Sequence, residues 1–175
     1  MNTGKQSVLK PQDLVVAIKL GVIRHRLLTY AELANELCLS ASEVHAATRR
    51  AELSRLVRRT EGAIVGVRSS LIEFILHGVP YCFPPNLGGV VRGTPTGIAG
   101  PVLHRHFNLE NDLVPVWPDA EGTARGLAFQ PLYPTVPAAA RRDAQLYEVL
   151  SLVDAIRGGA ARERELAKEE LQRRL

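Results

Sequence analysis

Two histidines one residue apart, His104 and His106, have the only spacing in the sequence that suggests metal chemistry. With His77 or Cys82 as a third ligand they could hold an ion such as zinc. No other spacing in the sequence supports such a site, and histidines are common on protein surfaces. We therefore expect neither a metal nor a cofactor.

The sequence lacks the motifs of common catalytic sites. The glycines at positions 88, 89, 93, 97 and 100 match neither the G-x-G-x-x-G pattern nor a Walker loop that would cradle phosphates. No serine stands in a G-x-S-x-G turn, and no cysteine has an evident histidine partner. The sequence therefore favours a binding protein over an enzyme.

Size and composition are those of an ordinary globular protein. The chain has 175 residues, 46% of them hydrophobic, which suits one domain or a small domain with appendages. No apolar stretch approaches the roughly 18 residues of a membrane span, and the first residues do not resemble a secretion signal. Cys38 and Cys82 lie in apolar surroundings and are expected to be small buried residues of a reduced, cytoplasmic protein.

Positive charge is concentrated in the first part of the chain. The net charge is +4, and residues 1–78 alone carry eleven lysines and arginines against seven acids. The remaining two parts, 79–136 and 137–175, are nearly balanced. Such an excess suits a polyanionic partner, although it could also be ordinary solubilising charge.

Proline divides the chain into three regions. Residues 1–78 are predicted to be helical, with a buried helix that opens at Pro11. Residues 79–136 hold nine prolines but also six of the nine aromatic residues, which predicts an ordered Pro/Gly-rich loop segment with short strands, packed on a helical scaffold. Residues 137–175 return to helix, with a stop at Gly158-Gly159. The expected fold class is mainly α.

The stretch LANELCLSASEV, residues 33–44, places two helix starts unusually close together. Thr29 with Glu32, and Ser40 with Glu43, have the spacing of a capping box. Only Cys38, Leu39 and Ser40 are left between the two predicted helices, so the helices must cross steeply.

This arrangement resembles the helix-turn-helix of bacterial transcription regulators over residues 29–51, although Cys38 stands where glycine is often found. The segment LSRLVRRTEGAIVGVR that follows resembles the wing of MarR- and IclR-type winged helices, with a tight turn at residues 60–63. Ser69 would then cap a further helix that ends at Gly78. The resemblance covers residues 11–78 and implies a DNA-binding domain.

The second helix of this unit is the predicted reader of DNA. If Val44, Ala47 and Ala51 face the core, the opposite face enters the major groove. Arg49 could then make a two-point contact to guanine, and Arg50 at the side of the helix would meet phosphate. The arginines of the wing would contact phosphates as well, and His25 between Arg24 and Arg26 could do the same. A solvated face that touches nothing is the alternative. The candidate DNA contacts are Thr29, Tyr30, Ser42, His45, Ala46, Arg49, Arg50, Arg58, Arg59 and Arg68.

Two features outside residues 1–78 bear on partners. The stretches 83–93 and 117–126 share an aromatic-Pro start and a closing Arg-Gly, which predicts two similar turns, with Arg92 and Arg125 as a less favoured pair of anion contacts. The apolar stripe of the helix before Gly158, continued by Leu171 and Leu175, predicts a homodimer interface, unless it merely covers the rest of the chain. The stripe consists of Leu146, Val149, Leu150, Val153 and Ile156.

The predicted function is that of a cytoplasmic, sequence-specific transcriptional regulator, a repressor that binds double-stranded DNA as a homodimer and has no contact with membranes. The alternative is an antitoxin-type or adaptor protein that binds a protein partner, encoded nearby, through residues 79–136. The residues do not reveal the operator sequence or an effector.

Overall fold

Helix α1 (Pro11–Val22) is the element on which the N-terminal region packs. Pro11 occupies its first turn, as predicted, and the Lys10 backbone N–H donates to the Asp13 carboxylate at 2.8 Å. Every residue from Gln12 to Val22 is buried. The computed structural model describes residues 7–23, 26–110 and 113–175. Within them α1 contacts α3 (Ala41–Leu53), β2 (Ala63–Gly66) and α7 (Ala144–Gly158).

Helices α2 (Tyr30–Leu37) and α3 (Ala41–Leu53) begin at the two predicted capping boxes. Thr29 accepts from the Glu32 backbone N–H, and Ser40 accepts from that of Glu43. The turn between them places Cys38 in the left-handed region, with φ 55° and ψ 40°. A residue in this left-handed conformation ends the helix and lets the chain change direction within three residues. Glycine is favoured at such positions because it adopts this conformation without strain.

A two-stranded antiparallel hairpin follows α3. Strand β1 (Val57–Thr60) pairs with β2 (Ala63–Gly66), and Val57 lies opposite Gly66. The two-residue loop contains Gly62 at φ 79°, a conformation that glycine adopts without strain. The predicted turn at residues 60–63 is therefore confirmed.

Helix α4 (Arg68–His77) starts two residues earlier than predicted. Its N-cap is Val67, not Ser69, and it ends at Gly78 as expected. The short helix α5 (Val79–Cys82) continues directly from it. Cys82 is exposed and Cys38 is half-buried, so the prediction that both cysteines are buried is wrong.

The middle segment is ordered and contains strands, as predicted. Strands β3 (Leu87–Pro95), β4 (Pro115–Pro118) and β5 (Ala124–Phe129) close into a small barrel, in which β3 is antiparallel to both others. The short 3-10 helices η1 (Gly97–Ala99) and η2 (Leu103–His106) lie between β3 and β4. Trp117 is fully buried, and its indole ring lies 5.6 Å from the Tyr147 ring of α7.

The two similar stretches do not form two similar turns. Residues 87–93 are extended in β3, whereas residues 117–126 run from β4 through a loop into β5. The sequence echo instead brings Arg92 and Arg125 directly opposite each other, as register partners in the β3–β5 ladder. The prediction of paired turns is wrong. Proline and glycine at similar positions in the two stretches do not determine which of their residues form a strand and which form a turn.

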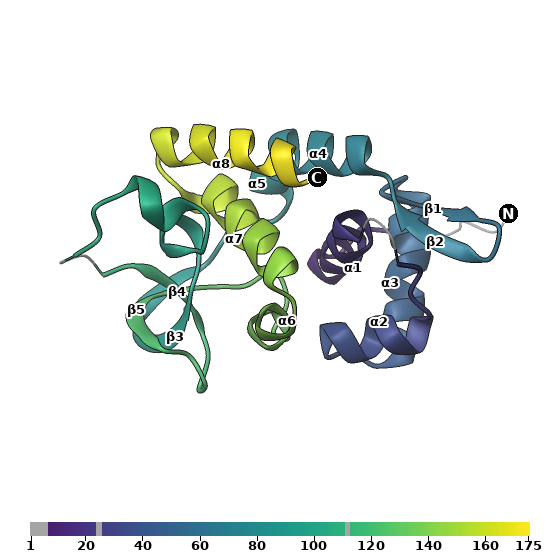
Figure 1. The fold of residues 1–175 in the computed structure, drawn as a ribbon, viewed down its shortest axis with the longest axis horizontal. Coiled ribbons are helices and arrows are strands. Elements are labelled where there is room, and N and C mark those ends of the chain that lie inside the picture. The colour runs from purple at the N-terminus through teal and green to yellow at the C-terminus, as the bar shows by residue number, and fades with distance from the viewer. Residues whose placement is uncertain (1–6, 24–25, 111–112) are drawn as a thin grey trace, which may run out of the picture.

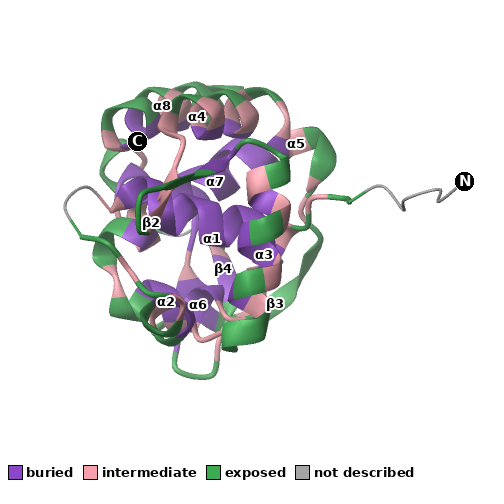
Figure 2. Cartoon of the chain, turned by 90° about the vertical axis from the view of Figure 1, so that its right-hand side faces the viewer, coloured by how far each residue is buried: buried purple, intermediate pink, exposed green. Residues whose placement is uncertain are grey.

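Three helices complete the fold: α6 (Val136–Arg142), α7 (Ala144–Gly158) and α8 (Ala161–Arg174). The end of α7 at Gly158 is as predicted. Helix α7 lies between the barrel and α1, with α8 packed along it (Figure 1). Figure 2 shows α1 and α7 buried at the centre, while the outer sides of α4 and α8 are exposed.

The apolar stripe of α7 is internal to a single chain. The side chains of Leu146, Val149, Leu150, Val153 and Ile156 are at most 1% exposed, and Leu171 of α8 is also fully buried. The stripe therefore covers α1 and the middle segment, which was the competing interpretation, and the dimer interface predicted for it is wrong. A periodic apolar stripe predicts that one face of a helix is buried. It does not predict whether the same chain or a second copy covers that face. No helix of the described residues is long and apolar enough to cross a membrane.

Candidate nucleic-acid interface

Helix α3 presents one buried face and one exposed face. Val44, Ala47 and Ala51 are fully buried against the core, as the sequence predicted. Ser42, His45 and Arg49 are exposed on the other side, and Ala46 is half-buried between them. This spacing leaves a row of polar side chains one turn apart along the outer side of α3.

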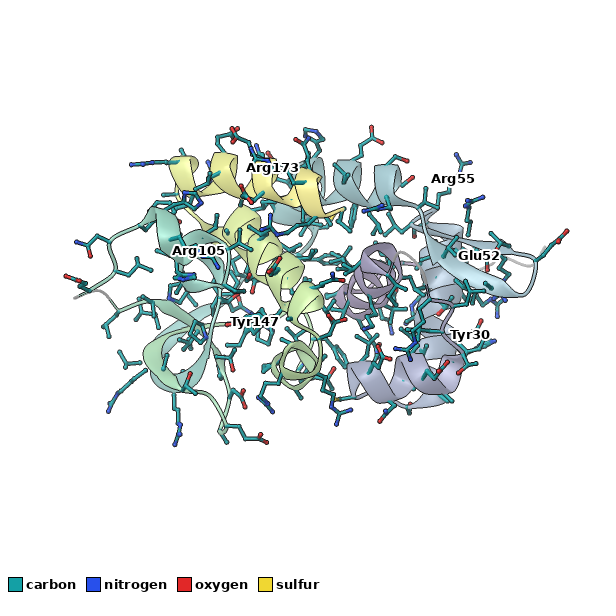
Figure 3. The ribbon with its side chains drawn as sticks, in the orientation of Figure 1. Tyr30, Glu52, Arg55, Arg105, Tyr147 and Arg173 are labelled. Atoms are coloured by element: carbon teal, nitrogen blue, oxygen red, sulfur yellow. The ribbon has the colours of Figure 1, made fainter. Side chains whose placement is uncertain are left out.

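Helices α2 and α3 and the β1–β2 hairpin lie together at one end of the molecule, opposite the barrel (Figure 1). Figure 3 shows Tyr30 of α2, and Glu52 and Arg55 near the end of α3, at this same end. Residues from three separate elements therefore share one surface, which we call the α3–hairpin face. It comprises Thr29, Tyr30, Ser42, His45, Ala46, Arg49, Glu52, Arg55 and Arg59, together with the neighbouring Arg58 of β1, whose side chain leaves the other side of the strand from that of Arg59.

Tyr30 connects α2 to both other parts of this face. Its ring lies 5.4 Å from the His45 ring, centroid to centroid, and its hydroxyl accepts from Arg59 Nη2 at 3.4 Å. Arg59 Nε in turn donates to the Glu52 carboxylate at 2.9 Å. The structure thus brings together three of the predicted contacts, Tyr30, His45 and Arg59, with Glu52 as an acidic neighbour that the sequence analysis did not single out.

A groove of about 380 Å³ separates the start of α2 from the hairpin. Thr29, Tyr30, Arg59 and Thr60 supply its polar lining, and leucine and isoleucine side chains form its floor. Arg59 supplies the positive charge of this groove and is paired with Glu52, and Glu32 accepts from Thr29 at the start of α2, so a phosphate group would compete with these two acids.

The first turn of α3 is held by a strongly acidic side chain. The Ser40 backbone N–H and hydroxyl both donate to Glu43, and the Tyr133 hydroxyl donates to Glu43 Oε1 at 2.9 Å. These hydrogen bonds to the charged form, with Ser40 the largest contributor, lower the pKa of Glu43 to about 2. The carboxylate therefore fixes α3 to the segment that follows the barrel.

Two predicted phosphate contacts lie elsewhere. Arg50 is turned toward α1, where its Nε and Nη2 donate to Asp13 at 2.8 and 2.7 Å. Arg68 is not on the hairpin, because β2 ends at Gly66 and Arg68 is the first residue of α4. Its Nη2 donates to the Arg174 carbonyl at 3.4 Å. Both predictions relied on the residues next to each arginine in the sequence. They could not include the acceptors, Asp13 and the Arg174 carbonyl, because these are distant in the sequence.

The hairpin keeps two of its predicted arginines. Arg58 and Arg59 are exposed on β1, and no ion pair of Arg58 occurs among the described residues. Arg26, before α2, forms ion pairs with Glu32 and Glu36 at 3.4 and 2.8 Å. Arg24 and His25, considered as backbone contacts in the sequence, lie outside the described residues.

Arg55 is a candidate contact that the sequence analysis missed. It is exposed and has φ 59°, which makes it one of two residues other than glycine in the left-handed region of the described chain. The backbone bond from the Leu56 N–H to the Ala51 carbonyl, 2.9 Å long, closes the C-terminal cap of α3 around it. Glycine is preferred at this position, so an arginine is retained at a cost of about 1 kcal/mol or more. The sequence offers one indication of this position. The residue that follows Leu53 and Ser54 at the end of α3, where glycine is usual, is an arginine.

The two histidines considered as metal ligands in the sequence, His104 and His106, lie on η2. His104 Nδ1 is 3.1 Å from the Gly100 carbonyl oxygen, and the described residues contain no cluster of three His, Cys, Asp or Glu side chains that could hold a metal. No protein-family model matches the chain, and neither a curated protein nor a solved structure matches it.

Proposed function

We propose that the chain binds double-stranded DNA through the α3–hairpin face and regulates transcription. The observation that carries the proposal is the split of α3 into a fully buried face and an exposed face that holds Ser42, His45 and Arg49. An α-helix fits the major groove of B-DNA, and arginine is the side chain best suited to a two-point contact with guanine.

Charge on the same surface supports the proposal. Arg49, Arg55 and Arg58 are exposed, and the described residues contain no acid that forms an ion pair with any of them. Each guanidinium is therefore available to a phosphate or a base edge. Binding of several phosphates releases counterions, so affinity should fall steeply with salt.

A duplex from the region upstream of the protein's own gene provides the test, with fluorescence anisotropy at several salt concentrations and a random duplex for comparison. Arg49→Ala should weaken binding to the specific duplex by about 1–3 kcal/mol and bind random DNA almost as well as the parent protein. Arg58→Ala should weaken binding to both duplexes and reduce the salt slope by about one. Arg105→Ala, which removes an exposed arginine from η2, is the matched control.

Equal losses on both duplexes for Arg49→Ala would show that α3 does not read bases. Affinity unchanged in both Arg49→Ala and Arg58→Ala would reject the proposal as a whole.

Repression by a homodimer is the mode of regulation we propose, because two copies can read a palindrome that one copy covers only by half. The interface cannot use the buried stripe of α7 and must lie on another surface. Analytical ultracentrifugation with and without the duplex tests this step, and one copy bound per operator would reject it.

A second candidate, a protein partner that binds through residues 79–136, is favoured by one observation. Tyr81 is 84% exposed and stands beside Cys82 and Phe83, which line an apolar groove of about 480 Å³ together with Val8 and Phe74. Tyr81→Ser should then weaken co-purification with the product of a neighbouring gene and leave DNA binding unchanged. Unimpaired co-purification would exclude this surface.

A further inference from the structure

The barrel carries two arginines in an unfavourable position. Arg92 of β3 and Arg125 of β5 are register partners in an antiparallel ladder, so their side chains leave the same face directly opposite each other. Both side chains are exposed. Like charges at directly opposite positions destabilise a sheet. An anion bound between them would reduce this repulsion.

The hydrogen bonds of these arginines leave most of their donors available. Arg92 Nε donates to the Gly122 carbonyl at 2.7 Å, which fixes the direction of its guanidinium. Neither arginine forms an ion pair with any acid of the described residues. The two arginines therefore concentrate positive charge at one end of the β3–β5 surface, and the Gly122 carbonyl holds the guanidinium of Arg92.

The same face becomes apolar toward the other end. Val90 lies opposite Leu127, two residues along from the arginine pair on each strand, and the two side chains are 40% and 42% exposed. Leu87, beyond the irregularity in β3, is 71% exposed. Residues two apart on a strand are separated by roughly 7 Å, which is within the reach of an arginine side chain.

A cavity opens beside these apolar side chains. Its volume is about 190 Å³, and it lies between the barrel and the junction of α7 with α8. Leu87 and Leu127, both exposed, line it together with Ile98, Pro115 and Phe129. An apolar cavity of roughly 150 Å³ holds a benzene ring, so this one accepts a six-membered ring or a short branched chain.

Two carboxylates also line the cavity, and both are already hydrogen-bonded. Asp154 accepts from Thr96, Trp117 and Arg157. Glu163 accepts from the Ala160 backbone N–H at 2.8 Å, at the start of α8. The cavity therefore offers a bound molecule mainly apolar contact, and the available charge lies outside it, at the arginine pair.

We propose that this surface binds a small amphipathic anion, with its apolar body in the cavity and its carboxylate between Arg92 and Arg125. A concave site with an apolar lining and a few polar groups that fix the orientation of the ligand is typical of small-molecule sites. The site lies at the opposite end of the molecule from α3 (Figure 1), and the inference does not depend on DNA binding.

Phenylbutyrate is a suitable probe because its ring fits the cavity and its flexible chain of three methylene groups carries a carboxylate away from the ring. Phenylbutanol and phenylbutylamine have the same apolar body with a neutral and a cationic head. In calorimetric titrations of the full chain, phenylbutyrate should bind at least about tenfold more tightly than either analogue, since a charge-assisted hydrogen bond contributes that much. Equal affinity for the three compounds, or no binding of phenylbutyrate, would overturn the proposal.

Variants of Arg125 test whether this arginine is responsible for the preference for an anionic ligand. Arg125→Gln should remove the preference for the anion, Arg125→Lys should keep part of it, and Arg105→Gln on η2 should leave it unchanged. Arg125→Gln should also raise the Tm of the free protein, because it relieves the repulsion from Arg92. An unaltered preference in Arg125→Gln would refute the assigned position of the carboxylate.

Methyl NMR spectra distinguish this site from the apolar groove beside Val8 and Phe74. Phenylbutyrate should shift the methyl signals of Leu87, Leu127 and Ile98 and leave those of Val8 and Leu9 in place. Shifts confined to Val8 and Leu9 would mean that the compound binds the groove and would refute the site.

Discussion

Arg50 and Asp13 form a two-point ion pair that joins α3 to the first turn of α1. The Asp13 carboxylate is fully buried and accepts Arg50 Nε at 2.8 Å and Nη2 at 2.7 Å, while the Lys10 backbone N–H supplies a further hydrogen bond. All of the close donors of this carboxylate thus come from one arginine and one backbone group. The pair holds the proposed reading helix at a fixed angle to the core.

We predict that Arg50→Ala destabilises the protein by about 3 kcal/mol, because it leaves a buried carboxylate without its counterion. Urea unfolding measures the loss. Arg49→Ala, one residue away on the exposed side, should change stability by less than about 0.5 kcal/mol. If Arg50→Ala keeps its stability and loses only DNA affinity, then Arg50 contacts phosphate after all and the ion pair contributes little.

The Asp13–Arg50 pair also shows where prediction from sequence reaches its limit. The capping boxes at Thr29 and Ser40 depend on partners three residues away, so local spacing was sufficient to predict both helix starts. Arg50 and Asp13 are 37 residues apart, and Tyr133 and Glu43 are 90 apart. No periodicity encodes such contacts, which form only when the elements pack.

The strands of the barrel show the same limit for a whole region. The aromatic residues of the middle segment predicted order, but the pairing of β3 with β5 depends on register over a long loop. The sequence repeat indicates that Arg92 and Arg125 occupy similar positions in two stretches, but it does not predict that they are neighbours. They lie opposite each other because β3 pairs with β5 when the barrel closes, and no local sequence pattern predicts that pairing.

Glu43 gives the protein a predicted dependence on acid. Its pKa in the folded protein is lowered from 4.5 to about 2 by the Ser40 and Tyr133 hydrogen bonds, so the charged form stabilises the fold. This contribution is complete above about pH 4.5 and is lost as the pH falls toward 2. Glu43→Gln should therefore be less stable than the parent protein at neutral pH.

The difference between the two proteins should narrow between about pH 4.5 and pH 2, as seen by chemical unfolding at a series of pH values. Glu73→Gln, which removes an exposed acid from α4, controls for the change in net charge. A stability difference that stays constant across this range would mean that the carboxylate of Glu43 has an ordinary pKa.

Cys38 is predicted to be a strained position. With φ 55° it costs about 1 kcal/mol relative to glycine, so Cys38→Gly should raise the stability by up to about that amount. Cys38→Val should lower it, because a β-branched side chain is least tolerant of this conformation. Thermal unfolding of the three proteins provides the comparison. A Cys38→Gly variant less stable than the parent protein would show that packing of the half-buried cysteine side chain outweighs the backbone strain.

Glu52 is predicted to restrain DNA binding, on the proposed function. It forms an ion pair with Arg59 on the α3–hairpin face and adds negative charge where phosphates would approach. Glu52→Gln should strengthen binding to specific and random duplexes alike, by about three- to tenfold at low salt, and less at high salt. Anisotropy titrations at two salt concentrations test this. Glu73→Gln serves again as the control on a different surface, and weaker binding by Glu52→Gln would contradict the assigned face.

Helix α8 is predicted to stabilise the single chain rather than a dimer. Ala167 and Leu171 are fully buried, and the helix packs on α7, α4 and η2. Leu171→Ala should lower the free energy of unfolding by about 2–5 kcal/mol, because it removes a large side chain from a closed core. The oligomeric state, measured by light scattering, should be the same as in the parent protein. Gln172→Ala, one residue along on the exposed side, should leave both quantities unchanged. If Leu171→Ala instead dissociated the protein into stable, fully folded monomers, α8 would have to reach across to a second copy.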